Sequence, residues 1–448
     1  MKSTKKIFTK ARFSTDATST NLNFDQGARA VTIGRDRGIR HGYVGRVCES
    51  SKGKSIFDAS VWMNTSFPSV IGVFGMRGTG KSFNLGVFTE CLAGDRQVCT
   101  GNDKSPAVVI FDVQNQFWTS AMQPTAEHDS AQLKMLAQWH LKPSVVPNVC
   151  CWTPTGKKSP LPGAREYQIH PDQLDNSDWL ALLEQERYSP MGQALIELLR
   201  KAKDCVPRAL AKTLHNAGAL PSAHPTTVDG LRWRLESLAE SDLIGAPGVD
   251  IKELLVPGRV SVMLLRDLPE SLRALTAATV VRQLAARMTQ FHQTRRLAER
   301  GKGAAPKVDL PHHLWCIMDE AHVIAPREGK TPANAPLVDY VKRGRDSGLS
   351  LIFATQQPSA VDNKLMSQVD ITFTHALGFE TDVQAAIDRM PTRKPAVYRC
   401  GGEKLSTPGD LIRSLKPGEA IIADSASQRP FIAQMRPRLS LHGGDTPT

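Results

Sequence analysis

The sequence predicts an α/β fold with a mostly parallel sheet. Three apolar segments of strand length, at residues 69–74, 107–111 and 314–318, each end at a glycine or an acidic residue. A helical pattern follows the first of them, over residues 81–94. Strand, helix and strand at this spacing indicate parallel strands joined by crossover helices.

The N-terminal 66 residues differ in pattern from the rest of the chain. Residues 1–27 are basic, rich in Ser and Thr, and without the apolar core of a secretory signal, so we expect a disordered leader rather than a transit peptide. Residues 28–66 contain short segments punctuated by glycine, and polar and apolar residues alternate over 55–63. This pattern predicts a small N-terminal β element, a barrel of reduced size.

One large domain, residues 67–435, is expected to contain the α/β core. Its first helix is predicted to stop at Gly94. Residues 123–256 are mostly helical in pattern, with helices near 193–202 and 228–239, and we interpret them as a helical insertion. Basic side chains on these helices are interpreted as solvated surface, with a nucleic-acid contact as the alternative.

The α/β pattern resumes after the insertion. Strands are predicted at 260–265, 349–355 and 420–423, and a long helix is predicted at 272–298. The segment 436–448 is polar and is predicted to be a flexible tail.

The composition favours a cytoplasmic protein with a polyanionic partner. Hydrophobic and charged fractions of 41% and 22% are ordinary for a globular protein, and no apolar run is long enough for a membrane helix. Eight scattered cysteines suit a reducing compartment. The excess of 56 Lys and Arg over 44 Asp and Glu, a net charge of +12, favours a partner rich in phosphate, although charge alone does not identify DNA or RNA.

A phosphate-binding loop follows the first strand. Its glycines let backbone N–H groups converge on an anion at a helix N-terminus. Lys81 is expected to reach the β- and γ-phosphates of ATP, and the Ser82 hydroxyl to ligate Mg²⁺. The flanking strand and helix favour this interpretation over a Gly-rich turn without function. The predicted cofactor-binding residues are Gly75, Met76, Arg77, Gly78, Thr79, Gly80, Lys81 and Ser82.

Two adjacent carboxylates, Asp319 and Glu320, follow the strand at 314–318. We expect Asp319 to orient the Mg²⁺ ion and Glu320 to activate water as a general base. An acidic pair on a surface is the alternative, and the buried strand before this pair argues against it. The sequence therefore predicts a P-loop ATPase that hydrolyses its nucleotide.

Two further polar residues are candidates for catalysis. Gln356 follows the strand at 349–355, and an amide there can bond both the attacking water and the γ-phosphate; a loop cap is the alternative. Arg345 precedes the same strand and cannot easily reach its own site. We expect it to act as an arginine finger in a neighbouring subunit, with Arg343 second, unless both are solvated helix residues.

These motifs in this order resemble the HerA branch of the HerA–FtsK superfamily of ring ATPases. The resemblance rests on the phosphate loop, on the DEAH sequence at 319–322, on RGRDSGLSLIFATQQPS at 343–359 and on the segments 256–265 and 369–372. It implies a RecA-like P-loop NTPase core.

The resemblance also implies partners. These are a homo-oligomer, expected to be a hexamer, duplex DNA in its channel, and a partner nuclease or other effector in antiphage defence or DNA end processing. A regulatory or scaffolding ATPase that does not translocate is the alternative. Two departures are the reduced barrel and Gln116, which cannot serve as a base and is given no catalytic role. His322 is a weaker candidate for contact with the γ-phosphate.

Overall fold

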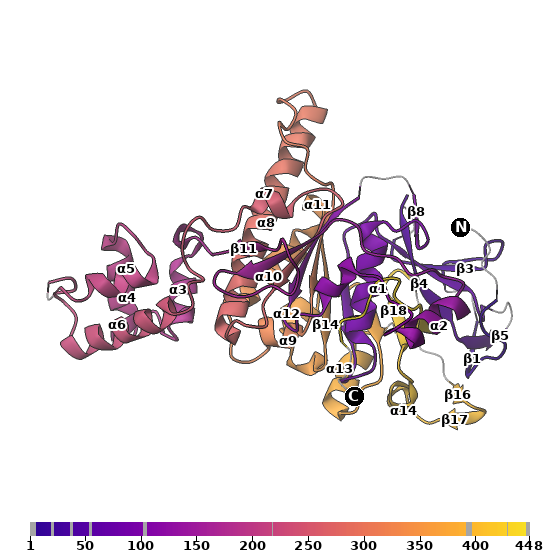
Figure 1. Cartoon of the computed structure of the whole chain (residues 1–448). Helices are drawn as coiled ribbons and strands as arrows, with labels where there is room; N and C mark the ends of the chain where they lie inside the picture. Colours follow the sequence, from indigo (N-terminus) through magenta and orange to yellow (C-terminus); the bar gives the residue numbers. More distant parts are fainter. Residues whose placement is uncertain are drawn as a thin grey trace.

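In the computed structural model, the phosphate loop connects strand β7 (Val70–Phe74) to helix α1 (Lys81–Ala93) near the centre of the molecule (Figure 1). All five residues of β7 are buried, as expected for a strand with layers on both faces. The described residues are 6–18, 22–35, 39–52, 56–101, 105–216, 218–390, 397–427 and 429–444.

The central sheet consists of parallel strands from its edge strand β11, through β7, to β15, the next strand after β7. Along this part the order is β11-β10-β12-β9-β13-β14-β7-β15, and every neighbouring pair is parallel. The predicted α/β class is confirmed. The strands are β9 (Ala107–Asp112), β10 (Val149–Pro154), β11 (Arg165–Tyr167), β12 (Val260–Leu264), β13 (Leu314–Met318), β14 (Leu349–Thr355) and β15 (Ile371–Thr374).

Alternate residues of these strands contribute to two separate hydrophobic cores. Phe111 and Cys316 belong to a core with Leu275 of α8 (Glu270–Glu299), whereas Ile110 and Ile317 belong to a core with Leu85 of α1. Side chains of a strand point alternately to opposite faces, so α1 and α8 cover opposite faces of the sheet. Helices α10 (Asn334–Lys342) and α11 (Gly344–Ser347) pack beside α8.

Beyond β15 the sheet continues with mostly antiparallel strands. β18 and β19 follow, and the N-terminal strands β4, β6, β3 and β2 extend the same sheet, with β8 paired to β4. The small N-terminal β element is therefore continuous with the central sheet. These strands are β2 (Phe24–Asp25), β3 (Ala30–Ile33), β4 (His41–Val47), β6 (Ser60–Asn64), β8 (Cys99–Thr100), β18 (Glu419–Asp424) and β19 (Phe431–Met435).

The two chain ends differ from expectation. β1 (Phe13–Thr18) lies within the predicted disordered leader, where it pairs with β5 and β16 and buries Phe13. The predicted flexible tail begins with Arg436 and Arg438, and both are fully buried because carboxylate and carbonyl acceptors surround them. A second sheet has the order β17-β16-β1-β5, with β5 (Glu49–Lys52), β16 (Tyr398–Cys400) and β17 (Glu403–Leu405).

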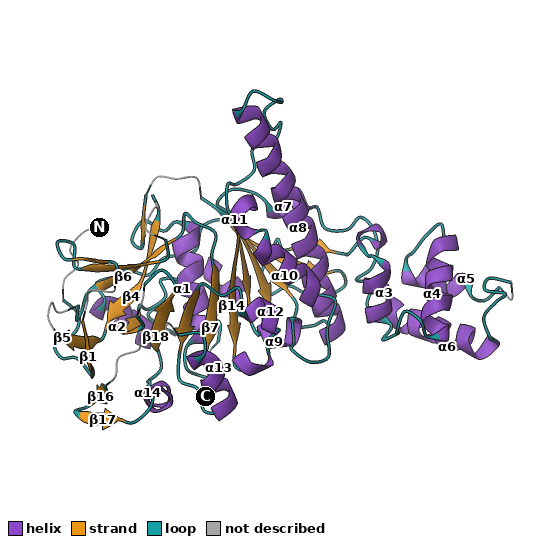
Figure 2. Cartoon of the chain, turned by 180° about the vertical axis from the view of Figure 1, so that it is seen from behind, coloured by secondary structure: helices purple, strands orange, loops and turns teal. Residues whose placement is uncertain are grey.

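The predicted helical insertion is shorter than expected. Strands β10 and β11 lie within its predicted bounds but join the central sheet. The helices that project from the body are α3 (Asn176–Leu182), α4 (Pro190–Lys201), α5 (Pro207–Thr213) and α6 (Pro225–Ala239), which we call the helical subdomain (Figures 1 and 2).

Short helices complete the fold. In the part of the chain that the structure describes, no helix has both the length and the apolar character of a membrane span. The remaining helices are η2 (Phe117–Ala121), α2 (Ser130–Gln138), η3 (Pro171–Gln173), α7 (Ile251–Leu254), α9 (Ala321–Ile324), η4 (Pro358–Ala360), α12 (Asn363–Met366), α13 (Glu380–Ile387) and α14 (Pro408–Ser414).

Candidate active site

The phosphate loop turns tightly between β7 and α1. Gly80 directly precedes α1 with φ of 108°, a conformation that side chains disfavour. At Gly75, a Cβ atom would lie 2.6 Å from Thr79 Oγ1 and 2.8 Å from the Cβ of His375. Glycine at these two positions thus allows the loop to curl so that its peptide groups surround one point.

Lys81 is folded back over this loop. Its Nζ donates to the carbonyl of Met76 at 3.1 Å, and the residue is only 6% exposed. Burial lowers the pKa of the ammonium group, whereas the nearby carboxylates Glu320 and Asp319 oppose that shift. The positive charge of Lys81 is therefore held at the point that the peptide groups of the loop surround.

Ser82, at the start of α1, is in contact with the buried Asp319. The Ser82 hydroxyl donates to Asp319 Oδ2 at 3.2 Å, although the two residues are far apart in the sequence. Burial, together with the charges of Glu320 and Asp112, raises the pKa of Asp319 to about 7. A buried carboxylate beside a hydroxyl is a donor set that suits Mg²⁺, whose charge would compensate for this burial.

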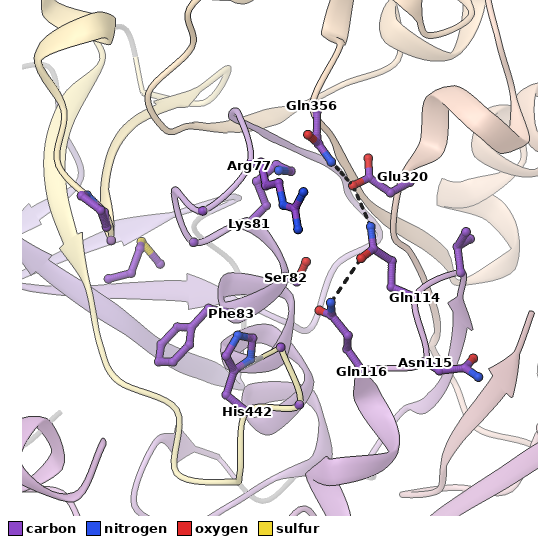
Figure 3. Close-up of a pocket in the computed structure, with 18 of the residues that line it drawn as sticks. Arg77, Lys81, Ser82, Phe83, Gln114, Asn115, Gln116, Glu320, Gln356 and His442 are labelled. Atoms are coloured by element: carbon purple, nitrogen blue, oxygen red, sulfur yellow. Dashed lines mark hydrogen bonds between the residues drawn. The ribbon is translucent and has the colours of Figure 1, made fainter. Parts of the chain in front are cut away.

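Glu320 occupies a strained backbone position directly after Asp319. Its φ and ψ of 50° and 53° lie in the left-handed region, which is unusual for a residue other than glycine and is often associated with function. Its Oε1 accepts hydrogen bonds from Gln356 Nε2 at 2.5 Å and from Gln114 Nε2 at 3.2 Å. Two amides from different strand ends therefore hold the carboxylate (Figure 3).

One cavity of about 1230 Å³ is lined by Lys81, Ser82, Gln114, Glu320 and Gln356. Figure 3 shows Lys81 and Ser82 on the wall of the cavity opposite Glu320, with Gln356 beside the glutamate. The strands that deliver them, β7, β9, β13 and β14, are neighbours in the parallel sheet. Carboxyl ends of parallel strands form one edge, which is where ligands bind in open α/β sheets.

Comparison with known proteins identifies the family of the chain. The family model described as "Helicase HerA, central domain" matches residues 43–283, more than half of the chain. This chain belongs to the HerA central-domain family. The family predicted from the sequence is confirmed.

Individual relatives of this HerA-family chain are distant. It is 29% identical over 140 residues to a probable helicase of Methanocaldococcus jannaschii, MJ1565, and the match covers 31% of this chain and 25% of that protein. The chain thus matches about a quarter of the length of this curated relative.

Solved structures show the same fold. The plasmid coupling protein TrwB in complex with ADP and Mg²⁺ is 14% identical, with a TM-score of 0.53 over 92% of this chain and 98% of that one. VirB4 of Thermoanaerobacter pseudethanolicus is 16% identical, with a TM-score of 0.52 over 90% and 98%. The HerA-family chain therefore has the P-loop ATPase fold of these proteins.

Arg345 lies away from the cavity. It is exposed on α11, directly before β14, whereas Gln356 directly follows that strand. The seven residues of β14 separate the two positions by roughly 23 Å. This HerA-family chain therefore does not bring Arg345 to its own phosphate loop, and an action on a neighbouring subunit stays a prediction.

His322 lies behind Glu320. Its Nδ1 is 3.1 Å from Thr355 Oγ1 and 3.4 Å from Glu320 Oε2, and its side chain lines two neighbouring hollows. Burial lowers the pKa of His322, which favours the neutral ring. His322 therefore contacts the Glu320 carboxylate from behind, whereas the sequence predicted a contact with the γ-phosphate.

Sequence reasoning missed several residues of the cavity. Gln114 carries no motif signal, but it follows β9 at the same sheet edge as the recognised residues. Arg266, in the loop after β12, and Arg273, in the first turn of α8, also line the cavity. Further unpredicted lining comes from the C-terminal end, with Pro437 and residues 442–444.

Proposed function

We propose that this chain is an ATP-hydrolysing ring motor of the HerA type that translocates on duplex DNA together with a partner nuclease or effector, in antiphage defence or DNA end processing. One observation carries the proposal. The groups predicted to bind phosphate, to bind the metal ion and to activate water meet at one edge of the sheet, with Glu320 held by Gln356 and Gln114. A site that only stored nucleotide would not require a carboxylate positioned in this way.

The proposed chemistry follows from these contacts. The loop N–H groups and Lys81 bind the phosphates, with the ammonium group exchanging the Met76 carbonyl for a phosphate oxygen. Ser82 and Asp319 would hold Mg²⁺, which supplies positive charge next to the phosphates when bound. Glu320 accepts the proton of the water that attacks the γ-phosphorus, and the bond from that phosphorus to the bridging oxygen of ADP breaks.

Gln356 completes the reactive half of the site. Its Nε2 donates to Glu320, which leaves its carbonyl oxygen to accept from the attacking water. Gln356 directly follows β14. A change in the group to which Gln356 is hydrogen-bonded would therefore act at the end of that strand. We therefore propose that it couples the state of the nucleotide to movement of the sheet edge.

DNA as the substrate of the motor is supported less directly. The matching family is described as a helicase, TrwB is described as a plasmid coupling protein, and this chain has a net charge of +12. A basic protein binds the DNA backbone by releasing condensed counterions. The expected ring rests on the family resemblance and would place Arg345 at a neighbouring site.

ATP hydrolysis with and without duplex DNA tests the proposal. We expect DNA to stimulate hydrolysis, and Glu320→Gln to lower the rate by about 100-fold or more while ATP still binds, because a general base contributes about this much. The matched control is Glu240→Gln, an exposed carboxylate at the end of the helical subdomain. A rate of ATP hydrolysis that DNA does not change, and that rises only when an effector protein is added, would instead support a scaffolding ATPase. Absence of hydrolysis under all conditions would overturn both functions.

A further inference from the structure

The C-terminal residues 436–444, which we call the C-terminal strap, are fastened to helix α1 through Glu90. One carboxylate oxygen, Oε2, pairs with Arg436 Nη1 at 2.7 Å. The other, Oε1, accepts from the N–H groups of Leu439 and Ser440 at 2.9 Å each and from the Ser440 hydroxyl at 2.7 Å. All four residues are buried, so these charge-assisted bonds form out of contact with solvent.

Arg438 provides a second attachment. It crosses α1 at Gly86, where a Cβ atom would lie 2.4 Å from Arg438 Nε, and its Nη2 donates to Ser120 Oγ at 3.0 Å. Further along, Thr119 Oγ1 donates to the Leu441 carbonyl at 3.0 Å. The strap is therefore fixed on one side to the helix of the phosphate loop and on the other to η2.

This attachment places the end of the strap inside the nucleotide cavity. His442, Gly443 and Gly444 line it together with Phe83, which directly follows Ser82. The rings of His442 and Phe83 meet edge to face, with centroids 5.3 Å apart and planes at 71°. Figure 3 shows this pair at the end of the cavity away from Gln356.

His442 has a defined hydrogen-bonding state. Arg438 Nη1 lies 3.3 Å from His442 Nδ1, and because a guanidinium can only donate, Nδ1 accepts and the proton resides on Nε2. Burial and the charge of Arg438 lower the pKa of His442 to about 4, so the ring is neutral at physiological pH. A neutral ring with one N–H donor suits an uncharged heteroaromatic ligand better than an anion.

We propose that the C-terminal strap is the nucleoside-binding wall of the site, where His442, Phe83 and the peptide groups of residues 443 and 444 receive the purine base of ATP. This rests on the proposed function, because the phosphates must occupy the loop at Lys81 and Ser82 for the nucleoside to extend toward Phe83. The two glycines have no side chains to cover their peptide groups, which line the cavity and supply hydrogen-bond partners for the polar edge of a base. At Gly443 a Cβ atom would lie 2.5 Å from the Gln116 carbonyl, so a larger residue would displace this wall.

Binding of ATP and of inorganic tripolyphosphate, which lacks a nucleoside, tests the proposal. Both are titrated into the full chain carrying Glu320→Gln, which prevents hydrolysis. We expect His442→Ala and a deletion of residues 442–448 each to raise the Kd for ATP about tenfold, equivalent to about 1.4 kcal/mol, and to leave the Kd for tripolyphosphate within about twofold. His128→Ala, at a largely exposed histidine, is the matched control, and Lys81→Ala should weaken both ligands.

Two results would overturn the proposal. One is an unchanged ATP affinity in His442→Ala; the other is an equal loss for ATP and tripolyphosphate, which would make the strap a structural support of α1. If the deletion variant lacks a thermal unfolding transition, His442→Ala decides alone. If the chain that carries Glu320→Gln alone binds neither ligand, both the proposed function and the proposed role of the strap are contradicted. Binding without DNA-stimulated hydrolysis would contradict the motor only.

Discussion

At the scale of single residues, the arrangement around Glu320 depends on side chains that no motif contains. Gln116 Nε2 donates to Gln114 Oε1 at 3.2 Å, and Gln114 in turn donates to Glu320. Because the oxygen of Gln114 is occupied by Gln116, its NH₂ group must face the carboxylate. Gln116 thus orients the amide of Gln114, and the absence of a catalytic role for Gln116 stays a prediction.

Substitution of Gln114 by Ala should slow hydrolysis with little effect on nucleotide binding. A hydrogen bond to a charged group contributes about 1.5 to 3 kcal/mol, so its loss predicts a kcat lower by about tenfold or more. Steady-state ATP hydrolysis measures kcat and KM, and KM should stay within about twofold.

Gln116→Ala is the matched control, because this side chain contacts Gln114 but not Glu320. Its kcat should fall by no more than about threefold. An unchanged or higher rate in Gln114→Ala would show that the amide holds Glu320 in an unproductive position.

At the scale of elements, the helical subdomain is joined to the core through α8. Arg282 of α8 donates to Asp178 Oδ2 at 2.7 Å, to the Gln173 carbonyl at 2.7 Å and to Asp175 Oδ2 at 3.3 Å. Asp175 caps α3 and Asp178 completes its capping box. One guanidinium therefore connects the start of the subdomain to the helix that covers the sheet.

Replacement of Arg282 by Ala should loosen the subdomain without unfolding the core. Asp178 is buried, and removal of its cationic partner leaves an uncompensated charge that costs about 3 kcal/mol locally. Hydrogen exchange should accelerate by about 100-fold in α3, while the central strands and ATP binding remain unchanged. Arg300→Ala, an exposed arginine just beyond the end of α8, should change none of these rates. Protection that stays equal in both variants would show that packing alone holds the subdomain.

At the scale of the whole molecule, the cavity contains the phosphate loop and Glu320 but not Arg345. Arg343, two residues before Arg345 and directly after α10, pairs with Asp339 of that helix at 2.9 Å. The Arg345 side chain is exposed and forms no hydrogen bond or ion pair with any residue that the structure describes. A composite site made by two copies of the chain is therefore the arrangement to test.

Arg345→Ala should lower hydrolysis by about 1000-fold and leave ATP binding intact, as expected for an arginine finger. Mixing Arg345→Ala chains with Lys81→Ala chains should restore part of the activity, because some sites then combine an intact loop with an intact arginine. Arg343→Ala should lose only a few-fold. If the mixture is as inactive as its components, Arg345 does not act across an interface.

Much of the fold was accessible from the sequence because buried parallel strands have a local signature. Residues 314–318 are a continuous apolar run that ends at two acids, and β13 has the same bounds. β14 likewise matches the predicted strand at 349–355. In contrast, β1 is mostly polar and β11 has only three residues, and their strand conformation depends on partners at Tyr398–Cys400 and Val149–Pro154.

For the site, the sequence alone predicts the groups expected at the phosphates, since the geometry of a triphosphate restricts them to a recognisable spacing from Gly75 to Ser82 and to acids at a strand end. The neighbours that hold Glu320, and the segment that closes the other end of the cavity, are known only from the folded chain. Arg436 and Arg438 have the composition of a solvated tail, and they are buried because Glu90, distant in the sequence, supplies the opposite charge. Long-range pairing of this kind leaves no local pattern, because its energy depends on two segments that meet only when the sheet is complete.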